Sequence, residues 1–481
     1  MKRLLIAAAL IAGLFIVVFV ARGVVYLQRN ETERYDDIRE HFKYGSFGSE
    51  ARLAVPEPLW MVMPDVFADL LPEGEGEGWE RFGFIYEPGR DRPIGTTLRK
   101  VPVPLIGLNC AVCHTGTVRF EPGGAEHVYL GMPAHEFDLQ AWARFLFAAA
   151  ADERWDTDLL IDAMQDAGAE LSWIDRQLYR YVVLPQVQDV LEDSAADFFW
   201  FDTRPDQGPG RVDTFNPYKV YWNDEFPGAF DMAADQTIGT ADLPSLWLQG
   251  PRDGMNLHWD GNNPSLFERN ISAAIGAGAS EDSLEIGEMR RIAAWIDGLA
   301  PPRVPDRYIE WDLVGEGAAL YAIRCASCHA FDGAEVGQIV PIGVIGTDPH
   351  RLESFGEQIA EYQNRLGGDR WWGLDHFTVT DGYANSPLDG AWLRAPYLHN
   401  GSVPTMRDLL AAPDDRPDTF YRGYDVYDFA DMGFVSSGAE AERLGFLFDT
   451  SLPGNGNEGH TYGVDLTQAE KDALIEYLKT L

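Results

Sequence analysis

Four cysteines and two histidines in this chain have the spacing that attaches haem covalently. They form two CxxCH motifs, Cys110-Ala-Val-Cys113-His114 and Cys325-Ala-Ser-Cys328-His329, and the chain has no other cysteine. In such a motif the two cysteines hold the porphyrin and the adjacent histidine binds the iron. A pair of redox or zinc CxxC sites is the alternative. Because every cysteine belongs to a complete CxxCH motif, two covalently bound haem c groups are the favoured interpretation.

The ligand on the other face of each iron decides whether such a protein is an enzyme or an electron carrier. An open face can bind O2 or H2O2, whereas a second strong protein ligand leaves electron transfer as the function. Besides the motif histidines, the candidates are His41, His127, His135, His258 and Met132 for the first iron, with His350, His376, His399 and His460 in the second half. By residue type alone, both His399 and His460 could bind the second iron.

The chain is strongly acidic. Asp and Glu outnumber Lys and Arg by 76 to 38, which gives a formal net charge of −38. This charge repels phosphates and therefore argues against nucleic acid as a partner. It would suit a basic redox partner, although it would also simply keep the protein soluble. With 46% hydrophobic and 12% aromatic residues, the 481-residue chain can build large cores, which argues against bulk disorder.

Residues 1–28 predict a signal anchor, a transmembrane helix that is not removed. Lys2 and Arg3 precede eighteen uninterrupted apolar residues, 4–21, which nearly span a bilayer. No clear small-x-small cleavage site follows, although a cleaved signal peptide is the alternative. The positive end predicts a cytoplasmic N-terminus. Either interpretation places the rest of the chain outside the bacterial inner membrane, facing the periplasm.

Helical periodicity and turn residues predict a mainly α protein with long irregular loops. Residues 30–106 are expected to form an irregular segment around the first haem, because Pro and Gly punctuate them. Residues 136–200 have a helical pattern, and residues 202–264 are rich in turn signals. A further helix is expected over residues 283–299.

Three prolines within residues 300–305 cannot continue that helix and mark the best domain boundary. The prediction is therefore a first cytochrome c-like domain, 29–300, that carries a large insertion, and a second cytochrome c-like domain, 301–481.

The second domain has the two helices that a small cytochrome c needs around its haem. The stretch EGAALYAIRCASCH predicts a helix that runs directly into the second haem motif. Near the end of the chain, Thr467 and Glu470 form a capping-box pattern. The apolar face of this last helix consists of Leu466, Ala473, Leu474, Tyr477, Leu478 and Leu481.

Several stretches give the chain a family resemblance. They are HFKYGSFGSE, NCAVCHTG, LHWDGNN, RCASCH, RAPYLHNGSVPTMRDLL and FDTSLPGNGNEGHTYG. With them the chain resembles the bacterial di-haem cytochrome c peroxidase and MauG superfamily, and most of all its rubber-oxygenase (RoxA-like) branch. The resemblance covers most of the chain after the predicted anchor. LHWDGNN and APYLHNGSVPT are its most specific motifs.

The resemblance implies roles for several residues. In that superfamily the tryptophan of a WDG motif lies between the two haems and serves electron transfer, which points to Trp259. Tyr397 and His399 are implied to line the second haem near its propionates. In the RoxA-like branch a late histidine is the distal ligand of the second haem, here His460. Peroxidases often use a methionine about fourteen residues past the loop histidine, but this position is Pro413.

Around the first iron the chain departs from the peroxidase pattern. Leu130 stands sixteen residues past His114, where resting peroxidases often have a distal histidine. Ala279 stands about twenty residues past the tryptophan, where peroxidases need a glutamate for O–O cleavage. Glu268, Glu281 and Glu285 are close to this position in the sequence but do not occupy it. Glu268 is taken as the candidate replacement for the peroxidase glutamate. By comparison with the RoxA-like branch, the expected distal pocket wall consists of Ile271, Ala274 and Ile275.

These features predict a haem-dependent oxidoreductase, either a cytochrome c peroxidase-like enzyme or a RoxA-like oxygenase. The first iron would be reactive and the second would relay electrons. The candidate catalytic residues are Trp259, Glu268, Tyr397 and His399. The expected partners are H2O2 or O2, with an apolar unsaturated substrate or a small redox protein, and some relatives imply a calcium ion between the domains. The alternative is a pure electron-transfer di-haem cytochrome c with both irons six-coordinate.

Overall fold

The N-terminal lobe, which comprises residues 30–108 and 139–197, contains a small antiparallel sheet where the sequence predicted an irregular segment. The computed structural model describes residues 30–52, 54–257 and 259–481, so the predicted anchor lies outside the described residues. In the described part of the chain, no helix is long and apolar enough to cross a membrane. The strand order is β1-β3-β4-β2, with β1 (Glu31–Thr32), β2 (Val55–Pro56), β3 (Thr96–Val101) and β4 (Val103–Leu108). Helices α2 (Ile38–Tyr44) and α3 (Glu57–Val66) accompany it.

The prediction for residues 30–106 is therefore wrong in part. The strands β1 and β2 have two residues each and pair with partners about 50 to 70 residues away along the chain. Such short strands have too few residues to show the alternation of polar and apolar residues that identifies a strand. The strands β3 and β4 are longer and form a hairpin, but Pro102 and Pro104 within it argue against strands.

The insertion after the first haem motif is helical, as predicted. Its helices are α5 (Leu139–Ala151), α6 (Thr157–Asp166), α7 (Trp173–Leu178) and α8 (Leu184–Asp197), with a π-helical turn, Tyr179–Val183, between the last two. These helices pack with α3 and the sheet around an aromatic core. In this core Trp60 and Trp79 stack with their ring centroids 4.1 Å apart.

The middle of the chain connects the two haem motifs. Its elements are α4 (Cys110–Cys113), β5 (Thr115–Arg119), β6 (Glu126–Leu130), β7 (Arg211–Asp213), α9 (Asn216–Glu225), β8 (Thr240–Asp242), α10 (Leu266–Gly276) and α11 (Ile286–Ile296). The turn-rich stretch 202–264 therefore also contains one regular helix, α9. Helix α11 confirms the helix expected over residues 283–299.

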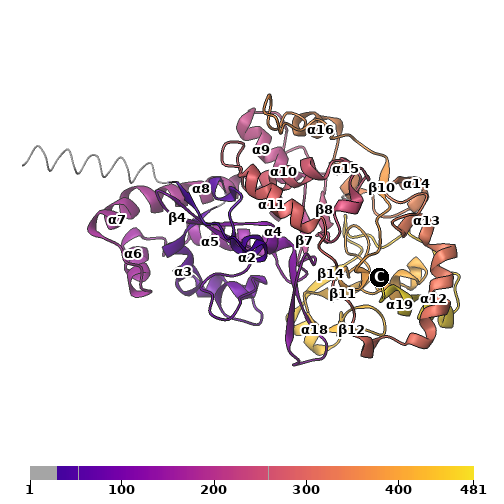
Figure 1. Cartoon of the computed structure of the whole chain (residues 1–481). Helices are drawn as coiled ribbons and strands as arrows, with labels where there is room; N and C mark the ends of the chain where they lie inside the picture. Colours follow the sequence, from indigo (N-terminus) through magenta and orange to yellow (C-terminus); the bar gives the residue numbers. More distant parts are fainter. Residues whose placement is uncertain (1–29, 53, 258) are drawn as a thin grey trace, which may run out of the picture.

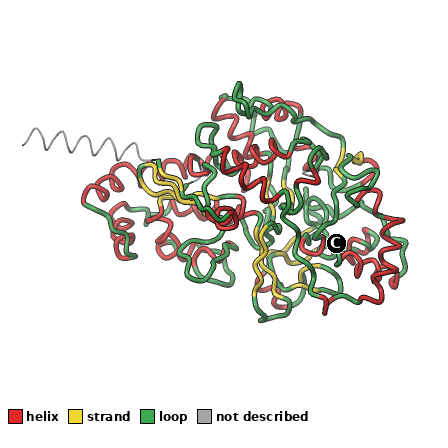
Figure 2. Tube along the Cα trace, viewed as in Figure 1, coloured by secondary structure: helices red, strands yellow, loops and turns green. Residues whose placement is uncertain are grey.

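The second half carries many short elements on long loops (Figures 1 and 2). Its helices are α12 (Trp311–Arg324), α13 (Ala326–His329), α14 (Ile342–Ile345), α15 (His350–Ser354), α16 (Glu357–Gln363), α17 (Met406–Leu409), α18 (Ala439–Leu444) and α19 (Gln468–Leu478). Its strands are β9 (Ile339–Pro341), β10 (Gly382–Ala384), β11 (Thr419–Arg422), β12 (Tyr427–Asp428), β13 (Gly433–Phe434) and β14 (Phe446–Asp449). The molecule is helix-rich, which agrees with the mainly α part of the predicted fold class.

Residues 30–300 and 301–481, called the first and the second half below, are joined by backbone hydrogen bonds. The amide of Asp242 donates to the carbonyl of His399 at 2.8 Å, and the amide of Arg119 donates to Asp425 at 2.8 Å. The domain boundary at residues 300–305 stays a prediction. These residues link α11 to α12 without helical structure.

Helices α12 and α19 pack closely, as expected for the helices before and after a cytochrome c haem. Thr467 caps α19, and its hydroxyl accepts a hydrogen bond from the amide of Glu470. The close packing depends on Gly317 in α12, because a Cβ atom there would lie 1.9 Å from the carbonyl oxygen of Ala473 in α19.

This contact predicts opposite effects for two glycines of α12. Gly317→Ala should lower the stability by roughly 1–3 kcal/mol, because the methyl group would push α19 away. Gly315→Ala is the matched control, since a Cβ atom at Gly315 has no atom within 4 Å. The control should be neutral or gain up to about 1 kcal/mol from its better helix propensity. Thermal unfolding followed by circular dichroism tests this, and equal melting temperatures for the two variants would contradict it.

Candidate functional site

The first haem motif lies at the start of a short helix and is oriented by a backbone carbonyl. The side chain of Asn109 caps α4 by accepting a hydrogen bond from the amide of Ala111. The Nδ1 atom of His114 lies 2.8 Å from the carbonyl oxygen of Pro244, so Nδ1 is the donor of this hydrogen bond. The proton on Nδ1 leaves the lone pair of Nε2 for a metal. Burial lowers the pKa of His114 to about 4, so the ring is neutral at pH 7.

The second haem motif repeats this arrangement. The Nδ1 atom of His329 lies 2.7 Å from the carbonyl oxygen of Ser386, which again leaves Nε2 for a metal. Burial lowers the pKa of His329 as well. The four cysteines form no disulfide, and burial raises the pKa of each thiol above its ordinary value. Each pair of cysteines is therefore free for attachment to a porphyrin.

His460 faces His329 across a gap of the size that an iron ion requires. The two ring centroids are 6.2 Å apart, and the ring planes are inclined by 51°. Two imidazoles that share one metal have their centroids about 6 Å apart, given metal–nitrogen distances of roughly 2 Å. Burial lowers the pKa of His460 to about 4, so this ring is also neutral. The geometry fits a haem iron held between His329 and His460.

The backbone of His460 has an unusual conformation that supports a specific role. Its φ angle is +45°, and Gly459 before it has a φ angle of +73°. A positive φ is rare for residues other than glycine, and such residues are often found at functional sites. Gly459 passes so close to the backbone of Gly346 that a Cβ atom would collide with it. The amide of His460 donates to Ile345 at 2.9 Å, so this loop is fixed against α14.

His399 has a different position from His460. Its ring stacks on Tyr383 with the centroids 4.1 Å apart, and its buried Nε2 atom has no hydrogen-bond partner among the described residues. Tyr397 is buried in the core, and its hydroxyl donates to the carbonyl of Met432 at 2.9 Å. Of the two candidate histidines, only His460 lies opposite His329 in the described structure. The catalytic roles of Tyr397 and His399 stay predictions.

Trp259 lies between the segments that orient the two motif histidines. Its indole Nε1 donates to the carbonyl of Asp242 at 3.1 Å, and its own carbonyl accepts a hydrogen bond from the amide of Ala384 at 2.6 Å. Asp242 stands two residues before Pro244, which holds His114. Ala384 likewise stands two residues before Ser386, whose carbonyl accepts the hydrogen bond from His329. The structure therefore connects Trp259 to both motif histidines through two short pieces of backbone.

Buried charges surround this connection. The Asp242 carboxylate pairs with the Arg422 guanidinium, and Asp260 pairs with Arg351 at 3.0 Å. Burial raises the pKa of Asp242, although Arg422 acts in the opposite direction. The Nε atoms of Arg211 and Arg422 are buried and have no hydrogen-bond partner among the described residues. Unsatisfied buried donors on cations fit a negatively charged group, such as the propionate of a haem.

In the described part of the chain, His114 has no counterpart to His460. Among residues 30–52, 54–257 and 259–481, no ring faces His114 as His460 faces His329. The Nε2 atom of His41 lies 3.0 Å from Glu288, and His127 stacks on Phe120 at the surface. The buried Met132 belongs to an apolar core with Trp247 and Trp392. His258 lies outside the described residues.

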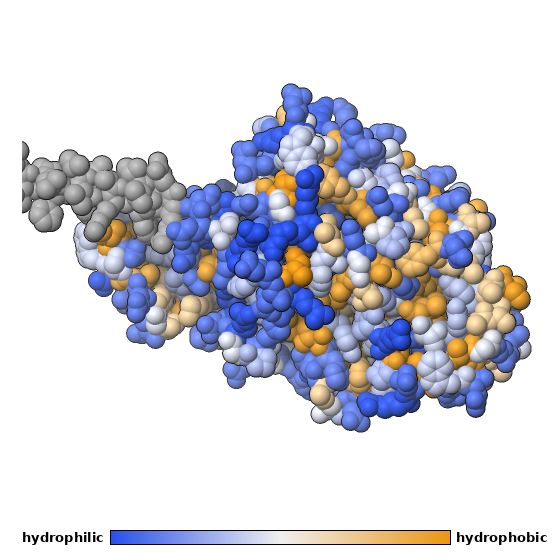
Figure 3. Space-filling model, in the orientation of Figure 1, coloured by the Kyte–Doolittle hydropathy of each residue, from blue (hydrophilic) through white to orange (hydrophobic). Residues whose placement is uncertain are grey.

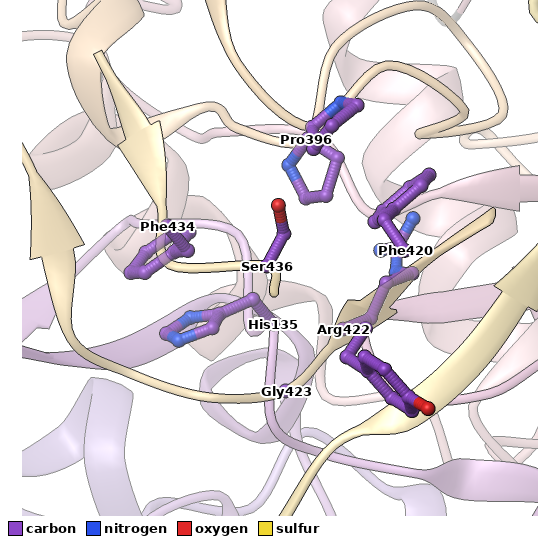
Figure 4. A pocket seen from close by; sticks show the side chains of 9 residues that line it. His135, Pro396, Phe420, Arg422, Gly423, Phe434 and Ser436 are labelled. Carbon is purple, nitrogen blue, oxygen red and sulfur yellow. The ribbon is translucent and has the colours of Figure 1, made fainter. Parts of the chain in front are cut away.

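His135 is buried and has no hydrogen-bond partner for either ring nitrogen among the described residues. Its ring stacks on Phe434 with the centroids 3.9 Å apart. It lines a small pocket with Pro396, Arg422 and Ser436 from the second half (Figure 4). Burial lowers its pKa to about 3. This pocket joins the two halves, and the structure shows no pairing of His135 with His114.

Helix α10 forms an apolar wall beside the first motif. The predicted pocket residues Ile271, Ala274 and Ile275 are buried in one cluster, and Cys110 packs against it. Ala279, at the position of the peroxidase glutamate, belongs to the same cluster. The structure therefore brings the predicted wall and the first haem motif together.

Glu268, at the start of α10, is already paired. Its carboxylate contacts Nδ1 of His376 and accepts hydrogen bonds from Asn263 Nδ2 at 2.9 Å and from the His376 amide at 3.1 Å. Burial alone would raise the pKa of Glu268, but these hydrogen bonds outweigh it and lower the pKa. Glu268 is therefore held as a carboxylate, which makes it a poor proton donor. The alternative carboxylates Glu281 and Glu285 lie near Arg370 and Arg99, respectively.

Four residues of the site carried no signal in the sequence. Pro244 and Ser386 act through their backbone carbonyls, which every residue type has. Asp242 and Arg422 form an ion pair across 180 positions of the chain, and neither belongs to a recognisable motif.

Comparison with known proteins supports a haem cytochrome. Residues 382–421 match the family model described as RoxA-like, cytochrome c-like, and this segment contains Ser386, Tyr397 and His399. A cytochrome c-like domain implies covalently bound haem c.

Two relatives come from Sinorhizobium fredii (strain NBRC 101917 / NGR234). The uncharacterized protein y4iJ is 27% identical over 511 aligned residues, which cover 85% of this chain and 82% of the relative. The uncharacterized protein y4iM is 31% identical over 283 residues, which cover 50% of this chain and 64% of the relative.

The position of His460 predicts which substitution opens the second iron. His460→Ala should remove the sixth ligand, so that the low-spin ferric spectrum of this haem is lost and added imidazole restores it. His399→Ala is the matched control and should leave the spectrum of the second haem low-spin. Ultraviolet-visible and electron-paramagnetic-resonance spectra of the purified variants are the measurement. The assignment is wrong if the control, rather than His460→Ala, opens the iron.

Proposed function

We propose that this protein is a di-haem c-type oxidoreductase that activates O2 or H2O2 at its first haem. The observation that carries the proposal is the difference between the two motif histidines. His329 has His460 opposite it, whereas no described ring is placed in that way opposite His114. An iron with two histidine ligands suits electron storage and delivery, and an iron with one suits the binding of a small oxidant.

Each group of residues has a defined task in this proposal. Cys110, Cys113 and His114 hold the reactive haem, and Cys325, Cys328, His329 and His460 hold the relay haem. The haem supplies the redox chemistry, and the protein sets its ligands, its surroundings and its access. Pro244 and Ser386 keep the two motif histidines in the tautomer that binds iron. Trp259 passes electrons between the two sites in this proposal, which its hydrogen bonds to both orienting segments support.

The surroundings of the first motif favour an oxygenase over a peroxidase. Peroxide cleavage needs a group that moves protons close to the bound oxidant. Ala279 has replaced the glutamate of the peroxidases, and Glu268 is held as a carboxylate by His376 and Asn263. The wall of α10 offers apolar side chains instead. We therefore infer an oxygenase that acts on an apolar unsaturated substrate. If the protein were instead a peroxidase, its partner would be a small redox protein.

The proposed location is the periplasmic side of the bacterial inner membrane. It rests on the apolar run 4–21 and on the cytochrome c-like segment, since residues 1–28 lie outside the described structure. A calcium ion between the two halves is proposed only from the family resemblance.

The decisive experiment is ligand binding to the first haem. The purified ferric protein should show one ligand-exchangeable haem and one low-spin haem, and cyanide or, after reduction, carbon monoxide should bind to one haem per chain. Optical and electron-paramagnetic-resonance titrations measure this. Two low-spin signals that do not change with cyanide, carbon monoxide or peroxide would instead support the electron-transfer cytochrome.

The role of Trp259 predicts a kinetic effect. Trp259→Phe should slow electron transfer between the haems by about tenfold, which corresponds to roughly 1.4 kcal/mol of barrier. Trp247→Phe is the matched control, because Trp247 also donates its indole N–H to a backbone carbonyl, that of Leu130, at 3.0 Å. Reduction of the protein by a photochemical donor, followed at the wavelengths of the two haems, gives the rate. Equal rates in the two variants would show that Trp259 only packs.

A further inference from the structure

One end of the N-terminal lobe exposes large apolar side chains that its own core does not use. The exposed fractions of Trp173 and Tyr181 are 67% and 70%. The apolar face of α6–α8, as we call it, consists of Leu159, Trp173, Ile174, Tyr181, Val182 and Val190, all of them exposed. Figure 3 shows apolar side chains at this end of the molecule. Trp173 and Ile174 begin α7, and Tyr181 and Val182 lie in the π-helical turn that follows it.

The local structure presents these side chains outward. The π-helical turn Tyr179–Val183 lies between α7 and α8, and such turns are often found at functional sites. Arg180 in this turn forms an ion pair with Asp158 of α6, which joins the two elements. The lobe beneath them already has a complete aromatic core, so the exposed residues are not needed to build it.

The start of the described chain places this lobe close to the predicted anchor. Asn30 precedes β1, whose sheet belongs to the same lobe as α6–α8 (Figure 1). The apolar run ends at residue 21, nine positions before Asn30. Nine residues span at most about 30 Å when fully extended. A chain anchored by residues 4–21 therefore keeps this lobe, rather than the second half, near the bilayer.

We propose that the apolar face of α6–α8 docks on the surface of the lipid bilayer, with Trp173 and Tyr181 at the level of the headgroups. The proposal rests on the anchored location given under Proposed function. Trp and Tyr are enriched at membrane interfaces, because their rings are apolar at one end and polar at the other. A helix that presents such side chains can lie in the plane of the interface.

The charges of this region define the kind of membrane. Between residues 157 and 197 there are nine Asp and Glu residues, but only Arg176 and Arg180 are basic. An acidic surface is not attracted to anionic lipids. The contact therefore depends on apolar burial, and a zwitterionic phosphatidylcholine bilayer is the appropriate probe.

The test measures the accessibility of side chains in the complete protein. The full chain is placed in phosphatidylcholine nanodiscs, with one chain per disc, and exposed to hydroxyl radicals produced by radiolysis. Trp371 is an internal control, because it is 65% exposed and belongs to the second half of the chain. Oxidation of Trp173, read by mass spectrometry, should be about fivefold slower than that of Trp371 if Trp173 is buried in the interface.

The same sample distinguishes what covers the face. A lipid with a photoreactive group in its acyl chain should form adducts with the peptide that contains residues 173–182. Protection without lipid adducts would mean that another protein segment covers the face, and equal oxidation of Trp173 and Trp371 would mean that nothing does. Either result overturns the docking but leaves the anchored location intact. A chain that does not enter the nanodiscs would overturn the anchored location and the docking together.

Discussion

The hydrogen bond from Nδ1 of each motif histidine to a backbone carbonyl is the interaction on which the rest of the site depends. It fixes the tautomer and the direction of His114 and His329, and thereby the position of any iron bound to them. The carbonyls belong to Pro244 and Ser386. Two residues before each of them, the backbones of Asp242 and Ala384 form hydrogen bonds with the indole and the carbonyl of Trp259, respectively. The backbone that orients the two motif histidines is thus the same backbone that positions Trp259.

The structure gives the two sites different surroundings despite their common motif. The second site is completed by His460, whose loop is held against α14 in a strained conformation. The first site is bordered by the apolar side chains of α10, and nearby carboxylates are tied to His376 or to arginines. The same CxxCH motif can therefore suit electron storage or oxidant binding, depending on the residues that face its histidine.

Local patterns predicted the parts of the fold that depend on local forces. The helices of residues 136–200, α11, α12 and the capped helix α19 were all expected, because helical periodicity and capping are encoded within a few turns. The sheet of the N-terminal lobe was missed for two reasons. Its strands β1 and β2 are short and pair across long stretches of chain. Its local hairpin β3–β4 contains Pro102 and Pro104, which argue against strands. In the site, the CxxCH spacing predicted which residues would bind haem. The carbonyls of Pro244 and Ser386 and the pair Asp242–Arg422 depend on tertiary contact and leave no local pattern.

The use of backbone carbonyls has a consequence for how such proteins diverge. A carbonyl is offered by any residue type, so positions 244 and 386 can change identity without loss of the hydrogen bond, provided that the chain keeps its path. Asp242 likewise accepts from Trp259 through its backbone. Sequence drift at these positions is then neutral for histidine orientation. Distant homologues can share this architecture while they retain few common residues outside the haem motifs, and geometry becomes the better guide to kinship.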